Sequence, residues 1–305
     1  MVMKEISCIS EYVKIVCECN DSLIRDGGGH NESLLFRGHA DKNYILMPNL
    51  GRGRRFATQL SIFNEERNLI EMAKYRMPDV FHDGLNPLEL LALLQHYGIP
   101  TRLLDVTENA LVALYFACCD KPDTDGEVFL FKENKTDITN YPIVYAIADS
   151  YRFCGTTWQS LSSFYGAVIS QPYFNEQRYR IQQCHSNNER GGAWVQECCQ
   201  KPLFVYAPAR KMRQQIQQGR YILFPNHITD FAGEQCFEHV IAEMPKDHEC
   251  IAERILIPAK AKKKLLSDLM VMGIRRDALF ADSVDIVCQE ITEEFRRKGI
   301  ITIND

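Results

Sequence analysis

The sequence HYGIPTRLLDVTENALVALYFAC, residues 96–118, is the part of the chain that decides the fold. Gly98 and Pro100 predict a tight turn, and residues 101–106 then have the composition of a short strand. Residues 109–119 follow as an amphipathic helix. A turn, a strand and a helix in this order predict an α+β arrangement in which the helix packs on the sheet that contains the strand.

Upstream, the sequence LLFRGH, residues 34–39, predicts a strand that ends in a charge. The guanidinium of Arg37 offers a planar fork of donors that matches phosphate or carboxylate. Gly38 leaves room for a ligand to approach the backbone, and His39 can adopt either charge state near neutral pH. In the competing interpretation, Arg37 is a structural arginine paired with a carboxylate such as Asp105.

The rest of the chain alternates between helical and extended patterns without repeats or low-complexity linkers. We expect helices at residues 5–25, 60–76, 88–97, 210–218, 259–272 and near 284–297. We expect strands at residues 34–38, 41–48, 101–106, 127–132, 143–147, 202–208, 220–224 and 253–258. These patterns favour one α+β domain over two, with a helical lead-in at 1–30, the domain itself at 31–290 and a tail at 291–305.

Composition limits the classes of function. The chain has 305 residues, 46% of them hydrophobic, and a formal net charge of -5, which argues against a protein that coats nucleic acid by bulk charge. Apolar runs are too short to span a bilayer and no secretory signal is visible, so we expect a cytoplasmic protein without a membrane partner. Twelve cysteines without CxxC spacing predict reduced thiols and no metal site, with Cys184-His185 near Cys198-Cys199 as the one alternative.

The strand at 101–106 carries two charges on opposite faces, Arg102 on one and Asp105 on the other. Buried charges need a partner or a ligand, so both an ion pair and a ligand contact are open for them. Thr107 is the expected N-cap of the helix that follows, and a helix N-terminus facing a pocket also favours anions. Tyr115 fits a core position better than a ligand contact.

Two further segments have polar character. Arg52, Arg54 and Arg55 form a basic loop, which is either simply solvated or in contact with nucleic-acid phosphates. The segment at 212–223 brings glutamine amides, among them that of Gln218, to a strand edge, where they suit ribose or base hydrogen bonds; a helix C-cap at Gly219 is the competing account.

The acidic pair at 65–66 and the absence of several known motifs bear on the class of function. Glu65 and Glu66 look like surface charges. Walker, GxGxxG, HExxH and GxSxG motifs are absent, which removes most simple nucleotide hydrolases, zinc proteases and esterases.

These motifs resemble the FRG domain, named after a Phe/Tyr-Arg-Gly signature that stands here as Phe36-Arg37-Gly38. The resemblance runs from about residue 34 to residue 290. It rests on FRGH (36–39), LLQHYGIPTRLLDVTENALVALYFAC (93–118), QQGRYILF (217–224), ERILIPAKAKKKLLSDLMVMGI (253–274) and ALFAD (278–282).

A second resemblance is to ADP-ribosyltransferases of the Arg/Ser-Thr-Ser/Glu type. Arg37 is similar to their arginine on the first core strand. Residues 104–107 and 109–117 are similar to their hydroxyl strand and following helix, with Thr107 as the surviving hydroxyl. This resemblance implies a mixed, mostly antiparallel split sheet flanked by helices, and the use of NAD as a substrate without a metal.

The chain departs from that pattern where the superfamily has Glu-x-Glu, because no glutamate stands near Gln218. The resemblance then implies that Gln218 holds the ribose, that Glu234 or Glu238 reaches the site, or that catalysis is absent. Some standalone relatives are similar to toxins of bacterial phage defence, which implies RNA or protein as a target and an antitoxin as a partner.

Three hypotheses follow. The first is an NAD-dependent ADP-ribosyltransferase acting on a macromolecule, with RNA as one candidate and the basic loop and the aromatic segment 150–180 as the contact surface. Its catalytic candidates are Arg37, Thr107 and Gln218, and its NAD-binding candidates are Arg37, Gly38, His39, Arg102, Asp105 and Tyr115. The second is a nucleotide- or RNA-binding module without catalysis. The third is a protein-interaction scaffold that uses the helices at 60–76 and 259–272.

Overall fold

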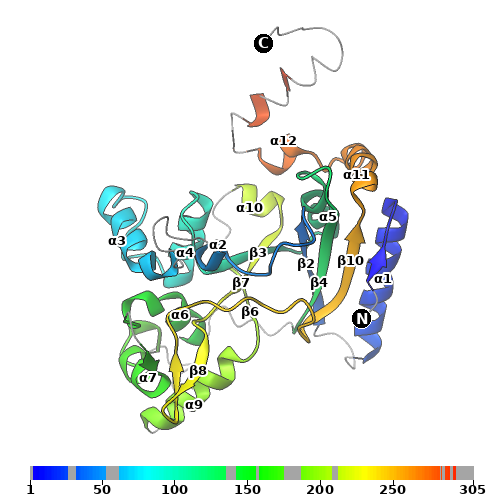
Figure 1. Ribbon diagram of the computed structural model, residues 1–305. Coiled ribbons are helices and arrows are strands. Elements are labelled where there is room, and N and C mark those ends of the chain that lie inside the picture. Colours follow the sequence, from blue (N-terminus) through cyan, green and yellow to red (C-terminus); the bar gives the residue numbers. More distant parts are fainter. Residues whose placement is uncertain are drawn as a thin grey trace.

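A seven-stranded sheet forms the centre of the protein (Figure 1). The computed structural model describes residues 3–26, 32–52, 62–134, 142–155, 158–174, 187–207, 212–281, 283, 286–288 and 291–292. In sheet order the strands are β1 (Lys4–Glu5), β10 (Ile251–Ile257), β4 (Gly126–Asn134), β2 (Glu32–His39), β3 (Leu103–Thr107), β7 (Gly219–Leu223) and β6 (Leu203–Val205). The β1–β10 pair is parallel and the other pairs of described strands are antiparallel. The predicted α+β fold with a mixed, mostly antiparallel sheet is confirmed.

The sheet is split between β2 and β3. Strand β2 pairs with β4 from Glu32 to His39, and β3 pairs with β7 from Leu103 to Thr107. Between β2 and β3, by contrast, the register joins a single pair, Phe36 with Thr107. We call β1-β10-β4-β2 the β2 half and β3-β7-β6 the β3 half. Beyond Phe36, β2 makes no further residue pair with β3. The seam between the two halves therefore lacks a continuous ladder of backbone hydrogen bonds.

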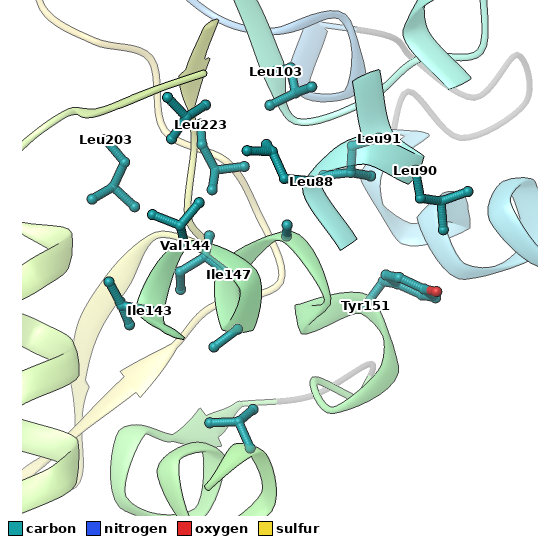
Figure 2. Close-up of a cluster of buried hydrophobic side chains, with 14 of the residues drawn as sticks. Leu88, Leu90, Leu91, Leu103, Ile143, Val144, Ile147, Tyr151, Leu203 and Leu223 are labelled. Carbon is teal, nitrogen blue, oxygen red and sulfur yellow. The ribbon is translucent and has the colours of Figure 1, made fainter. Parts of the chain in front are cut away.

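Helices cover one face of each half. On the β2 half, α1 (Ile9–Asp26), α5 (Ala110–Cys118) and α11 (Ala259–Val271) bury side chains such as Val128 and Ile255. On the β3 half, α4 (Pro87–His96) and α6 (Pro142–Ala148) enclose Leu103, Leu203 and Leu223 (Figure 2). The alternation of side chains places Leu103, Asp105 and Thr107 on one face, so these two apolar clusters flank the seam on the same side of the sheet.

The opposite face is covered mostly by irregular chain. Leu35, Phe129 and Ile222 of the sheet pack there against Leu46 and Phe63. The short elements α2 (Asn49–Arg52) and η1 (Ile62–Glu65) lie in this layer and lead into α3 (Glu66–Arg76). Both faces of the sheet are thus buried, which explains why its strands are so apolar.

A smaller group of elements lies beside the β3 half (Figure 1). It contains a three-stranded sheet in the order β5 (Gln159–Ser160), β9 (Glu234–Phe237) and β8 (Ile228–Phe231), with α7 (Leu161–Val168) and α9 (Asn188–Cys199) packed together. The remaining elements are η2 (Ser150–Arg152), η3 (Pro172–Phe174), α10 (Met212–Ile216) and α12 (Arg276–Leu279). The three-stranded sheet, α7 and α9 enlarge the core under α6.

Helix α5 packs directly on the backbone of two strands. A Cβ added at Gly38 of β2 would lie 1.9 Å from the carbonyl oxygen of Ala113, and one at Gly126 of β4 would lie 2.4 Å from that of Ala117. The helix is apolar on every side, as expected of a helix enclosed in a core. Gly38 is therefore required by helix packing, and it also lines the pocket, so the ligand approach predicted for it stays a prediction.

Three local predictions were wrong. Residues 143–147 form helix α6, since a continuous apolar run does not distinguish a buried strand from a buried helix, and Pro142 suits a first helical turn. Residues 41–48 form no strand beyond one bridge, from Leu46 to Met244. The N-cap of α5 is Asn109, whose side chain accepts from the backbone of Leu111 and Val112, and Thr107 belongs to β3.

Lys262 fastens α11 to the end of α5. It is 2% exposed, and its Nζ donates to the carbonyl oxygens of Ala40, Asp120 and Lys121 at 2.6, 3.0 and 2.8 Å. An ammonium has three donors, so all are used. We expect Lys262→Met to lower the free energy of unfolding by about 1–3 kcal/mol, because buried carbonyls lose their partner.

Urea denaturation measures this loss. Lys263→Met, at the exposed neighbouring position, is the matched control and should shift the free energy of unfolding by less than about 0.5 kcal/mol. Equal curves for the two variants would show that the three carbonyl contacts contribute nothing to stability.

Candidate functional site

A pocket of about 470 Å³ lies at the seam of the sheet. Its floor takes residues from both halves, Arg37 from the β2 half and Asp105 from the β3 half. Helices α4, α5 and α10 supply further side chains. The lining residues are Phe36, Arg37, Gly38, His39, Ala40, Tyr44, Asn49, Arg52, Gln95, His96, Asp105, Val106, Thr107, Val112, Ala113, Phe116, Asp120, Arg213, Gln214, Gln217, Gly219 and Tyr221. Its size suits a small ligand of nucleotide dimensions.

Arg37 is held at the seam by hydrogen bonds. Its Nε donates to Nε2 of His39 at 2.9 Å, and its Nη1 donates to the backbone carbonyl of Asp105. These bonds leave Nη2 without a partner among the described residues. Burial lowers the pKa of Arg37 to about 10, so the group stays charged at neutral pH. Arg37 thus links the two halves and keeps donors for an anion.

His39 acts as an acceptor in this arrangement. Its burial, followed by the nearby charge of Arg37, lowers the pKa of His39 to about 2. The imidazole is therefore neutral at physiological pH, as its acceptor role toward the Arg37 Nε requires. His39 fixes the plane of the guanidinium and adds no charge of its own.

Asp105 is the exposed residue of β3, and the other residues of this strand are buried. Its Oδ1 accepts a hydrogen bond of 2.8 Å from Nε2 of Gln95 on α4. The turn at Gly98, with a φ of 85° that favours glycine, ends α4 and returns the chain so that Gln95 lies beside Asp105. Asp105 does not pair with the guanidinium of Arg102, which was one of the sequence-based alternatives.

Thr107 lines the pocket with its hydroxyl already engaged. The Oγ1 donates to the backbone carbonyl of Gln217 at 2.6 Å and accepts from the backbone of Asn109 at 3.0 Å. Gln218, the predicted ribose-binding residue, is exposed, has a φ of 47° and does not line the pocket. Gln214 and Gln217 line it instead, and their Nε2 atoms donate to the backbone carbonyls of Ala207 at 3.4 Å and Leu279 at 3.1 Å.

Two more arginines border the pocket. Arg52 donates to the side chain of Asn49, and its Nε is buried without a hydrogen-bond partner among the described residues. Arg213 lies over the ring of Phe280 at 4.3 Å from the ring centroid. Together with Arg37 they give the pocket a cationic lining in a chain whose net charge is negative, which favours an anionic ligand.

Comparison with protein families gives a match, and the matched segment contains most of the residues that line this pocket. Residues 32–126 match the family model of the FRG domain. Comparison with curated proteins and with solved structures gives no match. The resemblance to ADP-ribosyltransferases therefore stays a prediction.

The FRG match contains β2, β3, α4 and α5, and with them both sides of the seam. Lining residues outside it are Arg213, Gln214, Gln217, Gly219 and Tyr221, which come from α10, β7 and the residue between them. The sheet likewise continues beyond the matched residues into β7, β6 and β10. The FRG segment thus supplies most of the pocket, and the later part of the chain closes its remaining wall.

Two predicted ligand contacts lie away from the pocket at the seam. Arg102 is fully buried, with its Nε 2.8 Å from Oε1 of Glu66 and its Nη1 bonded to the carbonyl of Phe224 and to Asn226. Tyr115 is buried in the cluster under α5 and does not line the pocket. The prediction of Glu66 as a surface charge was wrong, because this carboxylate is the buried partner of Arg102.

Other expectations from the sequence reach beyond the described residues. Arg54, Arg55 and the pair Cys184-His185 lie outside them. Within the described part of the chain, no group of three His, Cys, Asp or Glu side chains could hold a metal ion. None of the described helices has the length and apolar character needed to cross a bilayer.

Gln95, Tyr44 and Arg213 line the pocket without having been predicted as site residues. Gln95 stands directly before the HYGIP turn, so its polar side chain at the end of an apolar helix was the available signal. No pattern in the sequence marks Arg213 as a site residue, because only the tertiary arrangement of α10 brings it to the pocket at the seam.

Proposed function

We propose that the seam pocket binds NAD and that the protein transfers ADP-ribose from NAD to a macromolecular target. One observation carries the proposal: Arg37 and Asp105, from the two halves of a split sheet, line a single pocket of about 470 Å³. The partner-free Nη2 of Arg37 suits a phosphate oxygen. The carboxylate of Asp105 suits ribose hydroxyls.

The aromatic lining fits the other parts of such a ligand. Tyr44, Phe116 and Tyr221 line the pocket together with His96. Flat rings of this kind can stack with an adenine or a nicotinamide. Diphosphate, ribose and base would each find side chains of suitable chemistry in one cavity, which supports a dinucleotide over a simple anion.

A second candidate is a nucleotide-binding module without catalysis. It is favoured by one observation: no glutamate is found among the described residues that line the pocket. This candidate predicts NAD binding without release of nicotinamide, so one set of measurements separates it from the transferase.

The target in this proposal is RNA. Arg52, at the edge of the pocket, leads into the basic loop predicted to contact phosphates, and a cationic border suits a polyanion. Modification of RNA would harm the cell that makes the protein, which is the expected role of a toxin in anti-phage defence. Such a toxin would require an antitoxin partner.

The test uses the purified full chain. We expect titration calorimetry to show NAD binding, with Arg37→Ala weakening it about 10- to 100-fold, because a hydrogen bond from a charged group to the ligand is lost. Radiolabelled NAD should also transfer label to RNA. Arg25→Ala is the matched control, since Arg25 is exposed on α1 and its hydrogen-bond partners within the described chain, Asp21 and Ser22, belong to the same helix.

The results separate the candidates. Binding of NAD with neither nicotinamide release nor label transfer would support the module without catalysis. If the wild-type protein produces no heat with NAD, both candidates fail. Label on protein in place of RNA would keep the transferase and change its target.

A further inference from the structure

We infer that Asp105 supplies the carboxylate that faces the nicotinamide ribose and stabilises its cationic state, and that Gln95 and Thr101 are positioning residues for it. This inference rests on the proposed function. Three observations support it: the place of Asp105 in the seam, the orientation of its carboxylate, and the scarcity of other carboxylates in the pocket.

The seam explains why a charged side chain is accessible in the middle of the sheet. In β3 the residues Leu103, Leu104, Val106 and Thr107 are all buried, and Asp105 alone is exposed. Continuous pairing between β2 and β3 would have placed β2 alongside this residue. The register between the two strands joins only Phe36 and Thr107, so the Asp105 side chain opens into the cavity.

A chain of hydrogen bonds fixes the carboxylate. The hydroxyl of Thr101 accepts the backbone N–H of Leu103 at 3.2 Å, so its proton is directed to Oε1 of Gln95. This bond assigns the orientation of the amide and points the Gln95 Nε2 at Oδ1 of Asp105, 2.8 Å away. Thr101 is 2% exposed, so water does not compete for its hydroxyl.

The other carboxylate oxygen remains available. Oδ2 of Asp105 has no hydrogen-bond partner among the described residues, whereas Oδ1 is occupied by Gln95. The remaining acidic lining residue, Asp120, follows the C-terminal end of α5, and its Oδ1 accepts from the backbone of Lys121 at 2.8 Å. Asp105 is therefore the carboxylate beside Arg37, with one oxygen positioned and one oxygen directed to a ligand.

The chemistry that this carboxylate serves is cleavage of the bond between ribose C1' and the nicotinamide nitrogen. The bonding electron pair leaves with nicotinamide, which becomes neutral, and the positive charge passes to the ribose ring as an oxocarbenium ion. A fixed negative charge next to that ring stabilises it. The acceptor hydroxyl then forms a bond to C1', and its proton leaves to Asp105 and then to water.

The arginine and the aspartate have separate tasks in this scheme. Arg37 holds the diphosphate equally before and during cleavage, so it affects binding. Asp105 interacts most strongly when charge has developed on the ribose, so it affects the rate. The experiment therefore measures the effect of each substitution on kcat and on the dissociation constant for NAD separately.

The experiment compares NAD turnover, followed by nicotinamide release, with NAD affinity by calorimetry. We expect Asp105→Asn to lower kcat at least about 100-fold while the dissociation constant changes less than about threefold. Asp123→Asn, at an exposed aspartate outside the pocket, is the matched control and should leave both quantities unchanged. Thermal melting checks that each variant is folded.

The positioning residues are tested by a matched pair. Thr101→Val removes the hydroxyl that orients Gln95 and should lower kcat about 10-fold, as should Gln95→Leu. Thr101→Ser keeps the hydroxyl and should restore the wild-type kcat. A folding defect alone would lower kcat and the melting temperature together. It would not lower kcat in Thr101→Val at an unchanged melting temperature while Thr101→Ser keeps the wild-type kcat.

Each outcome decides the inference. A wild-type protein that turns NAD over while Asp105→Asn keeps its kcat within threefold overturns the inference and leaves the proposed function intact. A wild-type protein that binds NAD without turnover also overturns it, since no reaction needs the carboxylate. A wild-type protein that binds no NAD removes the proposed function itself.

Discussion

Replacing Gly38 by alanine is expected to destabilise the protein by at least about 3 kcal/mol, the upper part of the range for overpacking a core. The new Cβ would lie 1.9 Å from the carbonyl oxygen of Ala113 and 2.7 Å from the backbone nitrogen of Ala117. Both atoms belong to the backbone of α5, so no change of rotamer relieves the clash. The helix would have to move away from β2.

The same displacement would reach the pocket. Val112, Ala113 and Phe116 of α5 line it, so a variant that still folds should also bind the proposed ligand, NAD, more weakly. Urea denaturation gives the stability, and Gly155→Ala is the matched control. A Cβ at Gly155 meets nothing within 4 Å and its φ is not positive, so that variant should change stability by less than about 0.5 kcal/mol. Similar midpoints for the two variants would contradict the packing argument.

Removing the carboxylate of Glu66 should cost about 3–5 kcal/mol of folding stability, because Glu66→Ala leaves a buried arginine without its counter-charge. Arg102 is fully buried and Glu66 is 5% exposed. The remaining partners of Arg102, the carbonyl of Phe224 and the side chain of Asn226, carry no charge to compensate. The ring of Phe63 lies 5.2 Å from the guanidinium and offers only a weak substitute.

Two variants sharpen this test. Glu71→Ala removes an exposed carboxylate from the same helix and should change the unfolding free energy by less than about 0.5 kcal/mol. The double variant Glu66→Met, Arg102→Met removes both charges and should be more stable than Glu66→Ala alone. A double variant as unstable as the single one would show that packing at these positions matters more than charge.

The sequence predicted most of the sheet because its strands are short apolar runs between turns. The segment 96–118 gave a turn, a strand and a helix that the structure confirms within two residues at each end. The run at 143–147 was misread because it is apolar on every side, and periodicity then says nothing about helix or strand. The split itself came from a resemblance to known families, since no local pattern indicates which strands fail to pair.

The candidate site was predictable where a charge interrupts an apolar strand. Arg37 and Asp105 are such charges, and both line the pocket. Arg102 has the same signature and is a structural residue, because its partner Glu66 lies 36 positions away and only the fold brings the two together. Gln218 and Gln217 are neighbours in sequence, yet Gln217 lines the pocket and Gln218, whose backbone is in the left-handed region, does not.

Because β2 and β3 are joined by the single pair of Phe36 and Thr107, a ligand bound between them would be expected to stiffen the sheet. The register between β2 and β3 joins this one pair, so side-chain contacts such as that from Arg37 to the carbonyl of Asp105 also hold the two sides together. A bound dinucleotide would act as an additional brace between them and would raise the melting temperature by mass action. Slower amide exchange along β2 and β3 would then report binding, even for a variant that has lost all turnover.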